Sequence, residues 1–135
     1  MSDKFFLDSN VCIYAFDIDS KKKEKALDLI VRNQATVSTQ VLMETSNVAA
    51  KKLKFKPEKI QLSVDYITTF CLLHIIELST IKLAFQINRK YQYSLYDALI
   101  IASALESNCN ILYSEDMQHN HFIDKRLKIL NPFFT

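Results

Sequence analysis

Short apolar runs alternate with longer segments of helical pattern along this chain, and this alternation restricts its fold more than any other feature. The longer segments carry apolar residues at helical spacing, at 20–32, 40–53, 57–70, 80–91 and 94–107. The apolar runs lie before, between and after them, at 5–7, 36–38, 72–76, 111–113 and 128–130. This order is typical of a parallel sheet with helices on both faces. We therefore predict an α/β fold with a mainly parallel central sheet, in which the run 128–130 is an edge strand.

One helical segment differs from the others because it is apolar nearly all round. After Asp97 it reads ALIIASAL, from Ala98 to Leu105. A helix without a polar face is buried. We expect this helix to be central, with its N-terminus close to the ends of the strands.

Size and composition indicate one globular domain spanning residues 1–135. This length is usual for a single domain, and 49% hydrophobic with 24% charged residues is a globular composition. No apolar run approaches the roughly 20 residues of a membrane span, and the N-terminus lacks the layout of a signal peptide. We expect a cytoplasmic protein that does not enter a membrane.

Cysteine and glycine each add a constraint. Cys12, Cys71 and Cys109 lie far apart and form no C-x-x-C pair, which speaks against a disulfide frame or a zinc site, so we expect them reduced and buried. Glycine is absent. Positions with positive φ therefore need another residue, and asparagine is the most tolerant.

The charge of the chain leaves nucleic-acid binding open. The formal net charge is only +2, but basic residues gather at 21–25, 51–59 and 125–128. Such clusters are usually solvated faces, and contact with nucleic acid is the alternative.

Two acidic residues follow predicted strands. Asp8 comes directly after the run 5–7, and Asp116 lies three residues after Tyr113. The carboxyl ends of parallel strands meet at one edge of a sheet, where ligands bind. The structural alternatives are a helix cap for Asp8 and a turn residue for Asp116.

Two further acids lie in helical segments. Glu44 has Val41 and Val48 among its neighbours on one helix face, so it either has a partner or a metal, or reaches solvent at the boundary of the core. Asp97 lies three residues after Ser94, which is the spacing of a capping box. Helix initiation explains that pair, and the position near the strand ends adds a role in the site.

Four acids at one place repel one another unless a cation is present. Hard oxygen ligands select Mg²⁺ or Mn²⁺, and the sequence offers no convincing His/Cys set. The alternative is a softer metal at His119-Asn120-His121, which otherwise reads as a solvated loop.

Three stretches resemble the PIN domain family, and within it the VapC-like toxins of bacterial toxin–antitoxin pairs. They are FFLDSNVCIYAFD, STQVLMETSNV and SLYDALIIASALESNCNILYSEDMQH, which together extend over most of the chain. The resemblance implies a PIN-like sheet of four or five parallel strands flanked by helices on both faces, and a metal-dependent ribonuclease site. Its implied catalytic and metal-binding residues are Asp8, Glu44, Asp97 and Asp116.

The resemblance also implies supporting residues and partners. Around the acids we expect residues that contact the substrate or support the metal ligands, namely Asn10, Ser94, Ser114 and Glu115. The expected cofactor is one or two Mg²⁺ or Mn²⁺ ions, and the expected partners are an RNA substrate, a small antitoxin protein and a second copy of the chain in a homodimer. Asn108 and Asn120 stand where glycines are often found in this family.

The expected reaction is hydrolysis of RNA phosphodiester bonds by metal-activated water. Asp97 or Glu115 is a candidate for accepting a proton from the water. Tyr93 and Tyr96 lie near the site, and we expect them to be packing residues, with base stacking as the alternative.

Two other functions stay open. One is a non-catalytic PIN-fold module that binds nucleic acid or protein. The other is an aspartyl-phosphate phosphatase or a receiver domain, which Asp8 fits only superficially. A phosphatase of that kind has a second Asp two residues on, where this chain has Asn10.

Overall fold

A computed structural model describes residues 3–134, which form alternating strands and helices. In chain order the elements are β1 (Phe5–Leu7), α1 (Ser9–Cys12), the 3-10 helix η1 (Ile13–Phe16), α2 (Lys23–Ile30), β2 (Ala35–Ser38), α3 (Thr39–Lys51), α4 (Pro57–Phe70), β3 (Leu72–His74), α5 (Leu78–Tyr91), α6 (Leu95–Glu106), β4 (Ile111–Tyr113), β5 (Phe122–Ile123) and β6 (Leu127–Leu130).

The sheet has the strand order β3-β2-β1-β4-β6-β5. The first five strands are parallel, and Phe6 of β1 lies opposite Thr36 of β2 and Leu112 of β4. The predicted α/β class and mainly parallel sheet are confirmed. The described chain has six strands where four or five were predicted, because β5 adds an antiparallel edge strand to β6. The run 128–130 therefore lies inside the sheet and not at its edge.

The turn between β5 and β6 explains why β5 was not predicted. Asp124 and Lys125 both have positive φ, and the Arg126 amide donates to the Ile123 carbonyl across the turn. Tight hairpins of this kind normally carry Asn or Gly at these positions. Neither residue is present here, and a two-residue strand has too little pattern to stand out.

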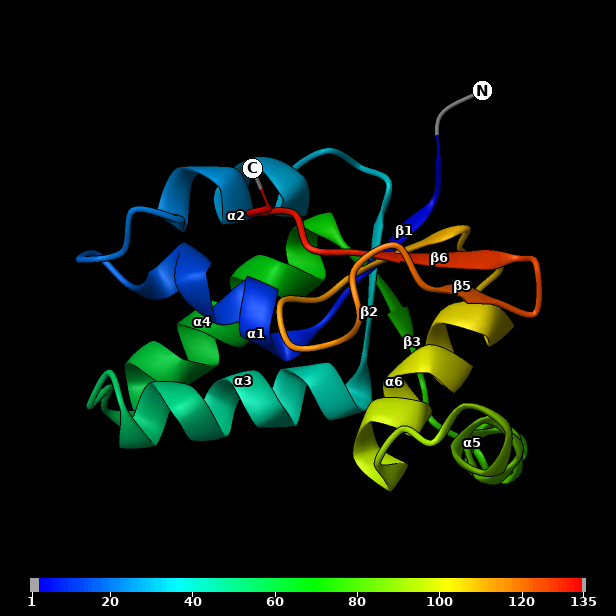
Figure 1. Cartoon of the computed structure of the whole chain (residues 1–135). Helices are drawn as coiled ribbons and strands as arrows, with labels where there is room; N and C mark the ends of the chain where they lie inside the picture. Colours follow the sequence, from blue (N-terminus) through cyan, green and yellow to red (C-terminus); the bar gives the residue numbers. More distant parts are fainter. Residues whose placement is uncertain (1–2, 135) are drawn as a thin grey trace.

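Helices cover the sheet in two layers (Figure 1). The connections from β1 to β2 and from β2 to β3 run in one direction across the sheet. The connection from β3 to β4 runs back in the opposite direction, past β2 and β1. Because parallel crossovers are right-handed, α1–α4 lie on one face and α5 with α6 on the other. The carboxyl ends of the parallel strands meet beside the start of α1 and the start of α6.

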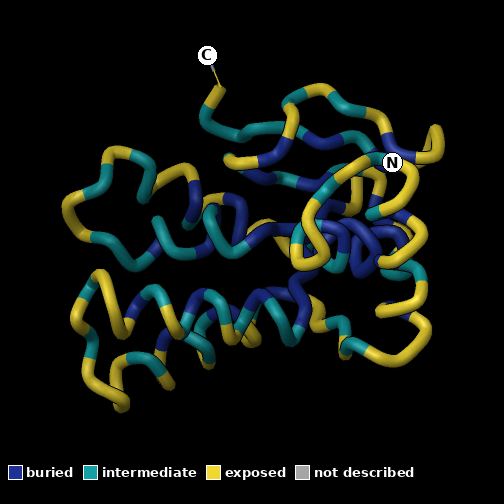
Figure 2. Tube along the Cα trace, turned by 60° about the horizontal axis from the view of Figure 1, so that its bottom comes forward, coloured by how far each residue is buried: buried dark blue, intermediate teal, exposed yellow. Residues whose placement is uncertain are grey.

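The core lies between these layers, and α6 is central to it. Residues Ile100 to Leu105 of α6 are all buried, as the sequence predicts, whereas Leu95 and Tyr96 in its first turn are exposed. Figure 2 shows that the buried parts of the trace gather at the centre of the molecule, while loops and outer helix turns are exposed. Cys12, Cys71 and Cys109 are free and buried, as expected.

Asparagine fills several of the positions that have positive φ. Asn33, Asn108 and Asn120 adopt φ values of 64°, 58° and 69°. Gln92, with φ of 66°, ends α5 in the same conformation. The left-handed region is thus reached without glycine, which agrees with the expectation for Asn108 and Asn120.

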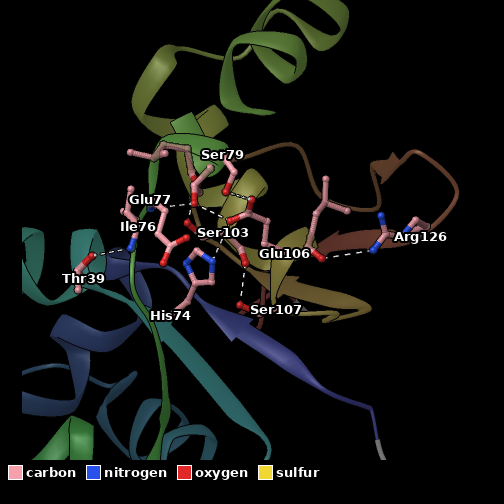
Figure 3. Close-up of polar contacts among 12 residues, drawn as sticks. Thr39, His74, Ile76, Glu77, Ser79, Ser103, Glu106, Ser107 and Arg126 are labelled. Atoms are coloured by element: carbon pink, nitrogen blue, oxygen red, sulfur yellow. Dashed lines mark hydrogen bonds and ion pairs between the residues drawn. The ribbon is translucent and has the colours of Figure 1, made fainter. Parts of the chain in front are cut away.

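The C-terminal end of α6 is fixed by a polar cluster around Glu106 (Figure 3). Its Oε1 accepts from Thr80 Oγ1 at 2.5 Å and lies 3.0 Å from His74 Nε2, and its Oε2 accepts from Ser79 Oγ at 3.0 Å. These contacts join α6 to the end of β3 and the start of α5.

Within the described residues, no helix is both long and apolar enough to cross a membrane.

Candidate active site

Asp8 lies where β1 ends, and the backbone turns there into α1. It is the N-cap of α1, and its Oδ1 accepts from the Ser9 amide at 2.7 Å. Its Oδ2 accepts from Ser114 Oγ at 2.9 Å and faces Asn10 Nδ2 at 3.4 Å. The predicted cap is therefore present, but the second oxygen contacts the loop after β4. The carboxylate joins the ends of two neighbouring strands.

Glu44 projects from α3 toward the same point. Its Oε1 accepts from Ser9 Oγ at 3.0 Å, and its Oε2 accepts from Gln40 Nε2 at 3.1 Å. The same Gln40 Nε2 donates to the Tyr96 carbonyl at 3.1 Å. Glu44 is half-buried, so it is not simply a solvated boundary residue. The Gln40 amide thus connects Glu44 on α3 to the first turn of α6.

Asp97 and Asp116 complete the acidic cluster. Ser94 Oγ caps α6 by accepting from the Asp97 amide at 3.3 Å. Asp97 is half-buried, and Asp116, in the loop after β4, is exposed. Burial raises the pKa of Asp97; a hydrogen bond with Ser94 offsets part of the rise, and the negative charge of Asp116 adds to it.

The pKa of Asp8 shows how the acids act on one another. Burial raises this pKa from 3.8 to about 6, and the charges of Glu44 and Asp97 raise it as well, against the lowering effect of hydrogen bonds from Ser114 and the Ser9 amide. None of the ion pairs among residues 3–134 includes any of the four acids. The four carboxylates therefore lie near one another without a protein cation.

The donors fit a hard divalent cation by type, because carboxylate oxygens are preferred by Mg²⁺ and Mn²⁺. They do not yet form a closed site. Among residues 3–134, no three Asp, Glu, His or Cys side chains lie close enough together to hold one ion. Binding by three or more of these acids requires their side chains to move closer together.

Asn10, Ser114 and Glu115 form the connection between α1 and the loop after β4. Asn10 Nδ2 faces Ser114 Oγ at 3.4 Å, and Asn10 Oδ1 accepts from the Glu115 amide at 3.1 Å. Asn10 and Ser114 also contact Asp8. Both therefore lie beside Asp8. Asn10 binds the loop after β4, at the position where an aspartyl-phosphate phosphatase has a second acid.

The Glu115 side chain is directed away from this cluster and already has partners. Its Oε1 accepts from Tyr14 Oη at 2.7 Å, and its Oε2 pairs with the Lys22 ammonium. Partial burial raises the pKa of Glu115, but the bonds from Lys22 and Tyr14 outweigh burial and hold the pKa below its usual range. The Lys22 ammonium also lies 4.9 Å from the centre of the Tyr14 ring. This geometry removes Glu115 as a free proton acceptor.

The histidines at 119 and 121 do not form a shared metal site. His119 Nδ1 accepts from the Asn131 amide at 2.9 Å, and the ring stacks on Phe134. His121 Nδ1 faces Tyr93 Oη at 2.6 Å, and the two rings are stacked. Each histidine has its own partners, so the alternative of a softer metal is not supported.

The two tyrosines near the acids differ from each other. Tyr93 packs against the core and His121, as expected. Tyr96 is 71% exposed, so the expectation that it packs is wrong for this residue. Its place in the first turn of α6 directs it outward, because the apolar face of that helix starts with Ala98.

A cleft of about 400 Å³ opens beside the acids. Its lining includes Asn10, Tyr14, Lys52, Glu115 and Asp116. Lys52 follows α3 directly and belongs to one of the basic clusters in the sequence. The cleft thus places a cationic side chain next to the acidic edge of the sheet.

Sequence reasoning missed Ser9, Gln40 and Lys22 as parts of this site. Ser9 adjoins Asp8, and Gln40 lies one helical turn before Glu44, so both positions carried a local signal. Lys22 had none, because its partner Glu115 is 93 residues away.

Comparison with known proteins indicates a family. The family model described as the PIN domain matches residues 5–123. No curated protein sequence matches the chain.

Comparison with solved structures indicates the same architecture. The toxin–antitoxin complex of Klebsiella pneumoniae has 20% identity and a TM-score of 0.71, covering 95% of this chain and 97% of that one. The sarcin–ricin-loop-cleaving toxin VapC20 of Mycobacterium tuberculosis has 16% identity and a TM-score of 0.68, with coverage of 83% and 89%. FitAcB of Neisseria gonorrhoeae has 14% identity and a TM-score of 0.66, with coverage of 97% and 99%. At these identities the likeness shows the fold.

Proposed function

Because this chain belongs to the PIN domain family, we propose that it is a metal-dependent endoribonuclease that hydrolyses RNA phosphodiester bonds. The observation that carries the proposal is the meeting of Asp8, Glu44, Asp97 and Asp116 at the carboxyl edge of the sheet without a protein cation. Structural likeness to a toxin that cleaves the sarcin–ricin loop supports RNA as the substrate class.

The four acids are the proposed ligands of one or two Mg²⁺ or Mn²⁺ ions. When bound, the cation would supply the positive charge that activates water and stabilises the leaving oxygen. Asp8 is held for this task by Ser114 and the Ser9 amide, and Glu44 by Ser9 and Gln40. These contacts reduce the freedom of both carboxylates, and the side chains of the acids still have to move closer together for three or more of them to bind one cation.

The remaining residues orient the loop and the substrate. Glu115, paired with Lys22 and Tyr14, holds the segment that carries Asp116. Lys52 in the neighbouring cleft is placed to contact a phosphate of the RNA. Of the two acids considered for accepting a proton from water, Asp97 alone has no ion-pair partner in the described part of the chain.

We further propose that the chain is the toxin of a toxin–antitoxin pair, acting in the cytoplasm as a homodimer. The Klebsiella pneumoniae structure is a toxin–antitoxin complex, which supports a small antitoxin protein as the partner. An acidic site that a cation activates is a natural target for such an inhibitor, since a basic side chain can replace the cation.

The test is cleavage of a mixed-sequence RNA by the purified chain with Mg²⁺, with Mn²⁺ and with chelator. We expect cleavage with metal and none with chelator, and a loss of about 100-fold or more in Asp116→Asn. Asp65→Asn, at an exposed position on α4, is the matched control and should cleave like the wild type. Absence of cleavage with either metal, together with unchanged RNA binding in chelator, would favour the non-catalytic binding module.

A further inference from the structure

Tyr96 does not pack against the hydrophobic core, unlike the other tyrosines of the chain. The chain has six tyrosines, and the other five, Tyr14, Tyr66, Tyr91, Tyr93 and Tyr113, pack against the core cluster. Tyr96 is 71% exposed and directly precedes Asp97. Its ring therefore contributes little to folding, and its backbone adjoins one acid of the site.

The backbone of Tyr96 is nevertheless fixed relative to the acids. Gln40 Nε2 donates both to the Tyr96 carbonyl and to Glu44 Oε2, each at 3.1 Å. Two acceptors on one nitrogen fix the orientation of the Gln40 amide, since a flipped amide would place its oxygen against both. The ring is free to contact a ligand while its attachment point stays at a set place beside Glu44 and Asp97.

Exposed apolar side chains also occur on the two helices that Gln40 joins, α3 and α6. Leu95, the neighbour of Tyr96 in α6, is 52% exposed, and Met43, one turn after Gln40 on α3, is 69% exposed. Exposed apolar side chains on both elements at the rim of a charged site suit a flat, uncharged ligand surface better than a phosphate. For a phosphate the chain offers Lys52, which lines the same cleft as Asp116.

A nucleobase supplies such a surface. Proteins that recognise single-stranded RNA stack unpaired bases on aromatic side chains, and this contact tolerates any base because every base has a π-face. A pre-positioned ring loses little freedom when it binds. We propose that the Tyr96 ring stacks on one unpaired base next to the cleaved phosphodiester bond, so that Tyr96 selects single-stranded RNA for the site.

This role rests on the proposed nuclease function, and the experiment keeps the two apart. A short single-stranded RNA that the wild type cleaves with Mn²⁺ is remade with one abasic residue at each position around the cleaved bond. The kcat/KM of the wild type, Tyr96→Ala and Tyr96→Phe is measured on the whole series. Phe85→Ala, an exposed aromatic on α5, is the matched control.

We expect Tyr96→Ala to lose about tenfold in kcat/KM on the intact RNA, mainly through KM, and Tyr96→Phe to restore most of the loss. One abasic position should lower the wild-type value by a similar factor and cause no further loss in Tyr96→Ala. The Mn²⁺ affinity of Tyr96→Ala should equal that of the wild type, because the acids are unchanged.

Three results would overturn the proposal while leaving the nuclease intact. The first is a kcat/KM of Tyr96→Ala equal to that of the wild type. The second is a loss from Tyr96→Ala that adds to the loss from the abasic residue at every position. The third is a changed Mn²⁺ affinity of Tyr96→Ala, which would mean that the ring acts through the acids. Unchanged cleavage combined with lost binding of a protein inhibitor would assign the ring to a protein interface. An inactive wild type would overturn the nuclease itself, and the stacking role with it.

Discussion

Asp8 is the residue on which the acidic site depends most, because it is both buried and charged. It is only 4% exposed, and its raised pKa means that folding disfavours its ionised form. Sequence reasoning placed Asp8 at a strand end, since a lone acid after an apolar run is a local signal. Ser114 Oγ donates to Asp8, and Ser9 Oγ donates to Glu44. Both bonds join segments that are distant in the sequence, so no local pattern predicts them.

The raised pKa of Asp8 predicts that Asp8→Asn changes the free energy of unfolding of the metal-free protein in a pH-dependent way. With a pKa of about 6 in the folded state against 3.8, ionised Asp8 destabilises the fold above pH 6, and this effect disappears below about pH 4. Asn removes the charge and can still cap α1. We expect the free energy of unfolding of Asp8→Asn to exceed that of the wild type by up to about 3 kcal/mol at pH 7.5, and by almost nothing at pH 4.

The measurement is urea denaturation in chelator at both pH values. Equal destabilisation at both would mean that Asp8 acts in the fold as a cap alone.

The Lys22 and Glu115 pair gives a second prediction at this scale. Lys22→Ala and Glu115→Gln each free the loop that carries Asp116, so each should lower kcat/KM for RNA by about threefold or more. The double variant should lose no more than the worse single variant, because both remove one interaction. Lys21→Ala, at the exposed neighbouring position, is the control. Additive losses would show that the two side chains act separately.

Among the elements, α6 joins the hydrophobic core to the acidic site, because it is buried along most of its length and carries Asp97 in its first turn. Its apolar sequence predicted its burial, and Ser94 predicted its start, because both signals are local. The cluster that fixes its C-terminal end was not predicted, since His74, Thr80 and Glu106 come from three elements. The strand β5 was missed for a different reason: it has two residues and a turn without Asn or Gly.

The Glu106 cluster predicts a pH-dependent loss of stability. Partial burial raises the pKa of Glu106, but bonds from Thr80, Ser79 and His74 outweigh burial and lower the pKa. Its contribution is therefore complete above the ordinary pKa near 4.5 and is lost as pH falls through the lowered value. We expect Glu106→Gln to lower the free energy of unfolding by about 1 kcal/mol at pH 7 and by less at pH 3.

Denaturant unfolding of Glu106→Gln beside Asp65→Asn, at an exposed position in the interior of α4, tests this expectation. Identical curves for the two variants would contradict a role of Glu106 in fixing α6.

For the whole molecule, the order of elements determines the site. The parallel strands β1 and β4 are neighbours in the sheet, so Asp8 and the loop that carries Asp116 lie at the same edge although they are far apart in the sequence. Helices α3 and α6 bring Glu44 and Asp97 to the same edge from opposite faces. The alternation of apolar runs and helical segments predicted this convergence, because parallel sheets gather their loops at one edge. The distances between the carboxylates depend on side-chain rotamers, which the alternation does not specify.

The most direct test of the shared metal site is a calorimetric titration of Mn²⁺ into the wild type and Asp97→Asn. This substitution keeps the helix cap, because Ser94 Oγ accepts from the backbone amide of residue 97, and the Asn side chain retains an oxygen that can bond to Ser94. We predict Mn²⁺ binding by the wild type and a loss of about tenfold or more in affinity for the variant, with RNA cleavage lost in parallel. Equal binding by both, or binding by neither, would contradict a metal site built from these four acids.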